Sequence, residues 1–116
     1  MCALPEGLTM VSFPGGFKAV VRESQVEKTL REGVTEGGGK AIKVRFLRGW
    51  PDRIVLWPRG VLHFVEMKKP KGSRFEPRQE RVHSWLRKMG FKVFVLYTKD
   101  QVEQYLNERK KVDELF

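Results

Sequence analysis

Two short apolar runs separated by a turn constrain the fold more than any other part of the chain. Residues 52–57 and 61–68 are each long enough for one strand, and the Pro-Arg-Gly sequence at 58–60 predicts a tight turn between them. Asp52 opens the first run after a Gly-Trp-Pro bend, and Glu66-Met67-Lys68 closes the second. The segment is therefore expected to form a β-hairpin with two carboxylates and an ammonium group at one end.

The remaining segments alternate between helical and strand patterns. Residues 22–36 have the apolar spacing of a helix, and the three glycines at 37–39 would end it. The nearly continuous apolar residues at 91–97 are typical of a strand that is covered on both faces. Thr98 and Gln101 form a capping-box pattern that opens a last helix. The sequence predicts an α/β protein of order αβββαβα, with a helix at 22–36, strands at 40–47, 52–57, 61–68 and 91–97, and helices at 76–89 and from 98 onward.

The two ends of the chain stand apart from this pattern. Residues 1–21 contain a Pro-Gly-Gly turn at 14–16 between two apolar runs, which indicates a hairpin or an arm that contacts a second copy. Residues 110–116 are expected to form a tail that frays. The whole chain of 116 residues suffices for one domain with a small hydrophobic core. Dimerisation would help to stabilise a domain of this size.

The charge balance indicates a polyanionic partner. The chain has 23 Lys and Arg against 14 Asp and Glu, a net charge of +9. The excess is concentrated between Lys68 and Lys92, where nine basic residues accompany only two acidic ones. A solvated basic helix is the alternative explanation of this stretch.

Cysteine content and hydropathy point to the cell interior. Cys2 is the only cysteine, which excludes an intrachain disulfide and a cysteine metal cluster and fits a reducing compartment. No apolar run is long enough to cross a membrane, and the N-terminus has no secretory pattern. We expect a soluble, intracellular protein.

The ends of the predicted hairpin have the chemistry of a metal-dependent phosphodiesterase. Strand alternation places Glu66 and Lys68 on one face, and Asp52 begins the neighbouring strand. Two carboxylates can bind Mg²⁺, with the backbone carbonyl of Met67 as a further ligand. Lys68 would orient or deprotonate the attacking water, or stabilise charge on the phosphate. The pattern alone is weak, because an ordinary hairpin can end in a surface ion pair.

Polar side chains on the apolar faces of two predicted helices add to this site. Glu23 and Glu27 lie near the apolar stripe of the first helix, where a carboxylate needs a metal or cationic partner. An irregular boundary of the apolar face is the alternative. Gln79 shares the apolar face of the second helix and can reach the strand ends to hold water, metal or a phosphate oxygen. A capping role is the alternative for Gln79.

Other residues of the second helix have separate interpretations. Arg78, Arg81 and Lys88 face outward and suit phosphate contacts. His83 is interpreted as a packed histidine and Trp85 as a core or interface residue rather than a platform for base stacking. His63 falls on the strand face opposite Glu66 and is left out of the site.

The motifs together resemble the virus-type replication-repair nuclease (VRR-Nuc) family. The resemblance covers roughly residues 22–106 and rests on Glu-Ser-Gln-Val-Glu at 23–27, Gly-Gly-Gly-Lys at 37–40, Gly-Trp-Pro-Asp at 49–52, Glu-Met-Lys at 66–68, and Gln79 with Leu-Arg-Lys-Met-Gly at 86–90. The family belongs to the PD-(D/E)XK, restriction-endonuclease-like superfamily and includes the Fanconi-associated nuclease. It implies a central mixed sheet flanked by helices and divalent-metal-dependent DNA cleavage.

The resemblance also implies roles for single residues. Asp52 and Glu66 match the metal-binding acids, Lys68 the catalytic lysine and Gln79 the helix glutamine, while Glu27 matches the first-helix acid, with Glu23 as the alternative. Met67 stands where an aliphatic residue such as leucine is common, a departure that should not affect the chemistry. The expected DNA contacts are Lys43, Arg53, Lys69, Lys71, Arg74, Arg78 and Arg81.

We expect residues 22–109 to form a Mg²⁺- or Mn²⁺-dependent endonuclease that recognises branched DNA by shape. Short phage and bacterial members of the family resemble Holliday junction resolvases and work as homodimers, so the expected substrate is a four-way junction and the expected location is the cytoplasm or nucleoid of a bacterial or phage-infected cell. A flap or nicking nuclease of the same superfamily is one alternative. A non-catalytic nucleic-acid-binding protein that uses only the basic helix is the other.

Overall fold

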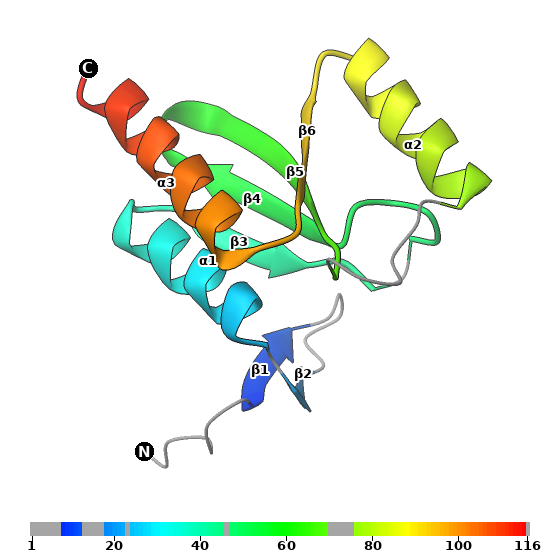
Figure 1. Ribbon diagram of the computed structural model, residues 1–116, viewed down its shortest axis with the longest axis horizontal. Coiled ribbons are helices and arrows are strands. Elements are labelled where there is room, and N and C mark those ends of the chain that lie inside the picture. The colour runs from blue at the N-terminus through cyan, green and yellow to red at the C-terminus, as the bar shows by residue number, and fades with distance from the viewer. Residues whose placement is uncertain (1–7, 13–17, 23, 46, 70–75, 116) are drawn as a thin grey trace.

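The chain forms a four-stranded mixed sheet with helices on both faces (Figure 1). A computed structural model describes residues 8–12, 18–22, 24–45, 47–69 and 76–115. This architecture confirms the α/β class, the mixed sheet and the order of the elements from the first helix onward.

The sheet has the strand order β3–β4–β5–β6. Its strands are β3 (Lys40–Lys43), β4 (Arg53–Trp57), β5 (Val61–Met67) and β6 (Lys92–Leu96). The first three pair antiparallel, and β5 pairs parallel with β6. The β4–β5 hairpin turns at Pro58–Gly60, where Arg59 and Gly60 both have positive φ, 67° and 74°. Because β4 starts where β5 ends, Asp52 and Glu66 are brought to the same edge of the sheet.

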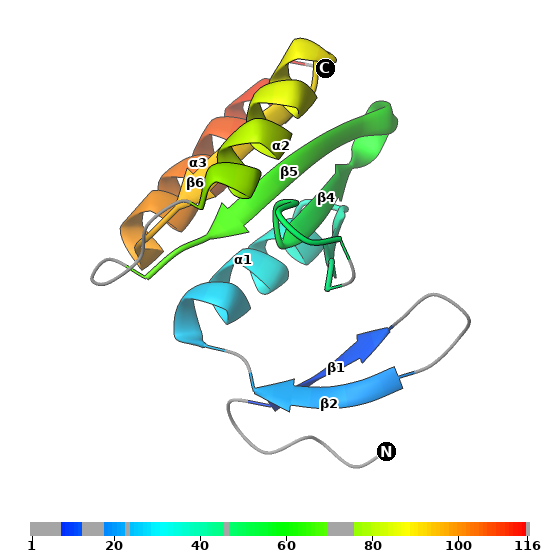
Figure 2. The ribbon, with the colours of Figure 1, turned by 90° about the vertical axis from the view of Figure 1, so that its right-hand side faces the viewer.

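Each face of the sheet is covered by its own apolar cluster. Helices α1 (Gln25–Glu36) and α3 (Lys99–Asp113) pack on one face through a core that includes Leu30, Val55, Val65 and Val102. Helix α2 (Pro77–Lys88) covers the other face, where Leu86 packs with side chains of β5 and β6 (Figure 2). Alternate residues of β5 therefore point to α2 and to the α1–α3 pair.

Caps and glycines define the ends of the helices as the sequence predicts. The Ser24 hydroxyl accepts the backbone N–H of Glu27 at 3.2 Å, and Thr98 does the same for Gln101. Gly39 passes so close to the Leu56 carbonyl oxygen that a Cβ there would lie 2.2 Å from it. No helix in the described part of the chain is both long enough and apolar enough to span a membrane.

Two boundaries differ from the sequence prediction. Strand β3 ends at Lys43 instead of 47, because the chain leaves the sheet to form the loop that leads to Asp52. Helix α3 extends through Asp113, into the expected tail, where Asp113 pairs with Arg59 and Arg109.

The N-terminal segment forms a separate antiparallel pair. Its strands are β1 (Leu8–Ser12) and β2 (Lys18–Arg22), which agrees with the hairpin interpretation, while the expected turn at 14–16 lies outside the described residues. Figures 1 and 2 both place this hairpin at the N-terminal end of α1, apart from the four-stranded sheet.

Candidate active site

Asp52 and Glu66 are joined directly at the sheet edge. The backbone N–H of Asp52 donates to Glu66 Oε2 at 3.1 Å, and the backbone N–H of Met67 donates to Asp52 Oδ1 at 3.2 Å. These reciprocal bonds cross from one strand to the next, so the two carboxylates are fixed by the backbone of the β4–β5 pair. The structure thus brings together the two acids that the sequence predicts for the site, and their role as metal ligands stays a prediction.

Gln79 connects Glu66 to Lys68. Its side-chain oxygen accepts from Lys68 Nζ at 3.0 Å and from the backbone N–H of Glu76 at 3.2 Å, while its amide nitrogen donates to Glu66 Oε1 at 3.4 Å. The amide thus caps α2 and also holds two members of the site. The capping interpretation is therefore confirmed, and Gln79 reaches the end of β5 as expected, while its role in holding water, metal or a phosphate oxygen stays a prediction.

Glu66, which is buried, and Asp52, which is partly buried, have pKa values above their usual range. Glu66 is only 6% exposed, and burial together with the neighbouring Asp52 charge raises its pKa to about 7. Burial also raises the pKa of Asp52, against the opposing effect of Arg53. The site therefore holds carboxylates whose negative charge is poorly compensated by the protein alone.

This donor set fits a hard divalent cation. Two carboxylates supply oxygen ligands, and a cation between them would offset the burial and the neighbouring Asp52 charge that raise the pKa of Glu66. The described residues contain no group of three His, Cys, Asp or Glu side chains placed to hold a metal ion. The remaining ligands would thus come from water, backbone or substrate, as is usual for Mg²⁺.

Glu27 lies beside this pair but is engaged by cations. Its Oε2 is 3.2 Å from Arg53 Nη2 and 3.5 Å from Lys43 Nζ, and Arg53 Nη1 lies 3.4 Å from Asp52 Oδ1. The four charged groups alternate in sign, with Arg53 between the two acids. The inward carboxylate expected on the first helix therefore has cationic partners here, and its role as a metal ligand stays a prediction. Its alternative, Glu23, lies outside the described residues.

Arg53 occupies a different place from the one expected of a DNA contact. Arg53 is only 6% exposed, and its guanidinium forms ion pairs with Glu27 and Asp52. It therefore positions these two acids instead of presenting a charge to solvent. Strand alternation could have revealed this, because Val55 and Trp57 of the same strand face the α1–α3 core and Arg53 follows their register. Lys43 is also held by Glu27, and burial lowers its pKa.

The other expected DNA contacts lie on the outer surface or outside the described residues. Lys69, Arg78 and Arg81 are exposed, and the last two lie on α2. Lys71 and Arg74 belong to residues 70–75, which the structure does not describe.

The loop between β3 and β4 packs against α2 at Gly49 and leads into Asp52. Gly49 has φ of 84°, and a Cβ at this position would lie 2.5 Å from Arg78 Cγ, so both the backbone conformation and the space require glycine. Val44 donates its backbone N–H to the Asp52 carbonyl at 2.8 Å, which closes the loop. The Gly-Trp-Pro bend thus positions the first acid.

The face of β5 that packs against α1 and α3 carries a buried network of hydrogen-bonded side chains. Trp57 Nε1 donates to the Tyr105 hydroxyl at 3.0 Å, and that hydroxyl lies 2.7 Å from His63 Nδ1. Since the indole N–H occupies the oxygen as an acceptor, the hydroxyl hydrogen is free to go to a neutral His63. Burial lowers the pKa of His63 to about 4, which agrees with this arrangement and with its omission from the site.

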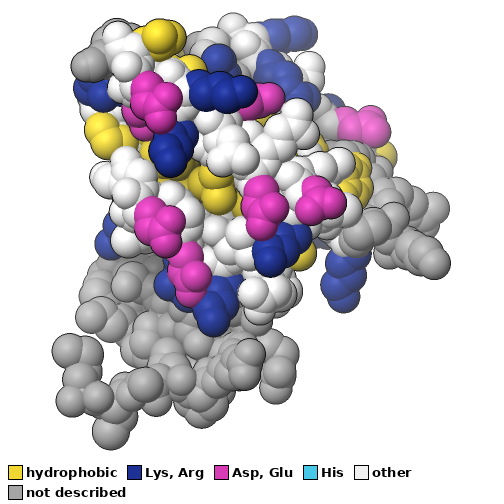
Figure 3. All heavy atoms as spheres, turned by 60° about the vertical axis from the view of Figure 1, so that its left-hand side comes forward, with side chains coloured by type: hydrophobic (Ala, Val, Ile, Leu, Met, Phe, Trp, Pro, Cys, Tyr) yellow, Lys and Arg dark blue, Asp and Glu magenta, His cyan; other side chains and the backbone are white. Residues whose placement is uncertain are grey.

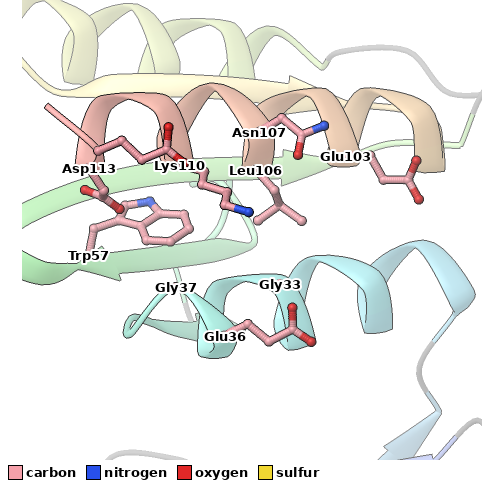
Figure 4. A pocket seen from close by; sticks show the side chains of 10 residues that line it. Gly33, Glu36, Gly37, Trp57, Glu103, Leu106, Asn107, Lys110 and Asp113 are labelled. Carbon is pink, nitrogen blue, oxygen red and sulfur yellow. The ribbon is translucent and has the colours of Figure 1, made fainter.

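A hollow between α1 and α3 lies on this opposite side of the sheet. It measures about 690 Å³, and Trp57 and Leu106 lie between the two helices that form it (Figure 4). Its lining includes four carboxylates, Glu36, Glu103, Asp113 and Glu114, against the single cation Lys110. Figure 3 shows acidic and basic side chains intermixed on this face. The hollow does not have the charge of a phosphate site.

The fold is that of a nuclease of the restriction-endonuclease-like class, and comparisons with known proteins identify the family. The chain is 41% identical over 85 residues to the "Putative nuclease p44" of Acyrthosiphon pisum secondary endosymbiont phage 1, a match that covers 70% of this chain and 88% of the relative. It also superposes on a solved VRR_NUC domain with a TM-score of 0.66 and 36% identity, over 72% of this chain and 91% of the other. No family model matches the sequence. The chain belongs to the VRR-Nuc family, as the sequence resemblance indicated.

Proposed function

We propose that this protein is a divalent-metal-dependent endonuclease that hydrolyses phosphodiester bonds in branched DNA. The observation that carries the proposal is the linked set Asp52, Glu66, Lys68 and Gln79 at one edge of the sheet. The carboxylates of Asp52 and Glu66 repel each other and would bind a metal ion, and the ammonium group of Lys68 beside them would bind the phosphate.

Each residue of the set has a distinct part in this chemistry. Asp52 and Glu66 would hold Mg²⁺ or Mn²⁺, which when bound polarises the phosphate and acidifies a coordinated water. Lys68 donates to the Gln79 side-chain oxygen, its charge acts on Glu66, and it would stabilise the added charge on the phosphate or orient the water. Gln79 positions Lys68 and Glu66, and Arg53 positions Asp52.

The hydrolysis itself needs only water as a co-reactant. The water oxygen forms a bond to phosphorus as the bond from phosphorus to the leaving sugar oxygen breaks. The water loses one proton and the leaving oxygen gains one, so charge and atoms balance. The protein supplies position and charge for this displacement, without a covalent intermediate.

The basic exposed side of α2 supports DNA as the substrate. Arg78, Arg81 and Lys88 are exposed on this helix, whose first turn forms part of the site. Contacts to phosphates fix orientation without reading sequence, which suits recognition of DNA shape. The four-way junction and the homodimer stay predictions, and the separate β1–β2 hairpin is the segment that we propose as the dimer contact.

A cleavage assay with matched lysine variants tests the proposal. Labelled four-way junction, flap and linear duplex are incubated with Mg²⁺, Mn²⁺ or EDTA, using wild type, Lys68→Ala and Lys69→Ala. We expect metal-dependent cutting of branched DNA that Lys68→Ala abolishes and that Lys69→Ala, which removes the same charge from an exposed neighbour, reduces only a few-fold. Paired symmetric cuts in the four-way junction would support a dimeric resolvase. Cuts in flaps alone would support a flap or nicking nuclease of the same superfamily.

Binding of the metal is measured separately from cleavage. Titration calorimetry with Mn²⁺ should show binding to wild type and a large loss of affinity in Asp52→Asn. DNA binding without cleavage of any substrate, and without Mn²⁺ binding, would overturn the enzyme proposal in favour of a non-catalytic binder.

A further inference from the structure

Trp85 is a large aromatic residue that the core of the protein does not use. It lies on α2 with 51% of its surface exposed, although the sequence suggested a core or interface position. The inward positions of α2 are filled by other residues, of which His83 and Leu86 are buried. One edge of the indole rests near Trp50, with ring centroids 6.0 Å apart at an angle of 67°. The rest of the ring is open to a ligand.

The surface around Trp85 is cationic. A shallow hollow of about 520 Å³ runs along the outer side of α2, and Arg81, Ser84 and Lys88 line it together with Trp85. Arg81 lies one turn before the indole and Lys88 one turn after it, and Glu80 is the acidic residue among the described lining. An aromatic face between cations can stack a nucleobase while the cations contact the adjoining phosphates.

This surface is connected to the proposed active site through two elements. Trp50, which supports the indole, lies two residues before Asp52. Gln79 precedes Trp85 by six residues on the same helix, which places the indole about 9 Å along the axis and about 120° around the helix from the Gln79 side. A DNA strand bound at Glu66 and Lys68 would have to continue around α2 to bring one of its bases to Trp85.

We propose that Trp85, flanked by Arg81 and Lys88, stacks an unpaired base of the DNA substrate beside the cleaved strand. This inference rests on the proposed nuclease function and narrows its substrate to flaps and other branches that carry single-stranded nucleotides, in place of a fully paired four-way junction. Within a continuous duplex each base is already stacked between its neighbours and has no free face for the indole. Trp85 thus acts as a residue that determines specificity, without a part in the bond-breaking step.

Binding in EDTA, where cleavage is prevented, tests the inference. Fluorescence anisotropy measures the affinity of wild type, Trp85→Ala, Trp85→Phe and Met89→Ala for a flap with a single-stranded arm and for a blunt duplex of equal length. We expect Trp85→Ala to weaken flap binding about tenfold and leave duplex binding within twofold, while Trp85→Phe restores most of the affinity. Met89, 59% exposed one turn further along, is the matched apolar control and should have no effect.

The indole also gives a direct signal. Oligo-dT should quench the tryptophan emission of the wild type more than that of Trp85→Phe, in which Trp50 and Trp57 remain. Equal losses for flap and duplex, or no loss in Trp85→Ala, would overturn the inference and leave the surface to a protein partner. Circular dichroism and melting temperature establish that each variant is folded.

The failure of this inference differs from a failure of the nuclease proposal. If wild type cuts branched DNA in Mg²⁺ at a rate that Trp85→Ala does not change, the stacking inference fails and the function stands. If wild type cuts nothing but binds the flap through Trp85, the nuclease proposal fails, and the surface is that of a binding protein.

Discussion

The two faces of strand β5 bury polar groups in opposite ways. Glu66 on the α2 face and His63 on the α3 face are 6% and 7% exposed. His63 is kept neutral and shares a hydrogen-bonded network with Tyr105 and Trp57, whereas Glu66 faces a second carboxylate. A satisfied network stabilises a fold, but a repelling pair costs stability and persists where a ligand relieves it. We therefore interpret the buried His63 as a structural residue and the buried Glu66 as a member of the proposed metal site.

The largest expected effect comes from removing a charge on the Glu66 face. Asp52→Asn keeps the shape of the side chain, yet we expect cleavage to fall by roughly 1000-fold or more, because a ligand for the metal is weakened. Single-turnover cleavage of a flap or junction measures the loss, with melting temperature as the control for folding. Activity within tenfold of wild type would remove Asp52 from the site.

On the His63 face, the loss of one hydroxyl should affect stability instead. Tyr105→Phe leaves Trp57 Nε1 and His63 Nδ1 without their partner, which we expect to cost roughly 2 to 4 kcal/mol of unfolding free energy. Urea denaturation gives the value. Cleavage at a temperature where the variant is folded should stay near wild type, and a selective loss of activity would place this network in the catalytic machinery.

The pH dependence of stability should also distinguish the faces. The pKa of His63 is lowered from 6.5 to about 4 by folding, so the unfolded chain binds more protons between these values. Stability from this group is therefore complete above pH 6.5 and declines as the pH falls toward 4, by roughly 2 kcal/mol. Denaturation of wild type and His63→Gln across this range measures the difference. A parallel decline in both would assign the acid sensitivity to other groups, including His83, whose pKa burial also lowers.

Glu66 should contribute with the opposite sign. Its pKa is raised from 4.5 to about 7, so the folded chain binds more protons and this group destabilises the metal-free protein as the pH rises through that range. We expect Glu66→Gln to raise the unfolding free energy at pH 8 in EDTA by about 1 kcal/mol, while cleavage is lost. Addition of Mn²⁺ should stabilise wild type and leave Glu66→Gln nearly unchanged. A destabilised variant at pH 8 would mean that the carboxylate is satisfied in the free protein.

The sequence by itself determined the elements and the members of the site that depend on local pattern. Alternation in the hairpin placed Glu66 and Lys68 on one face, and the capping residues and glycines located the helices, because these features depend only on neighbours along the chain. The same pattern identified Asp52 and Gln79 as partners. Asp52 and Glu66 lie at the two ends of one hairpin, and Gln79 lies in the first turn of the next helix along the chain, so all three are close in sequence.

Only the tertiary structure decided how the charges are paired and which surfaces stay open. Arg53 looked like a DNA contact from its sequence position, but the packing of α1 against β4 turns it to Glu27 and Asp52. Trp85 was predicted to be a core or interface residue, and the core alternative is wrong because other residues fill the inward side of α2 and leave the indole exposed. Strand alternation indicates that Arg53 faces inward, but its ion-pair partners and the exposure of Trp85 depend on elements that are distant in sequence, so local periodicity does not specify them.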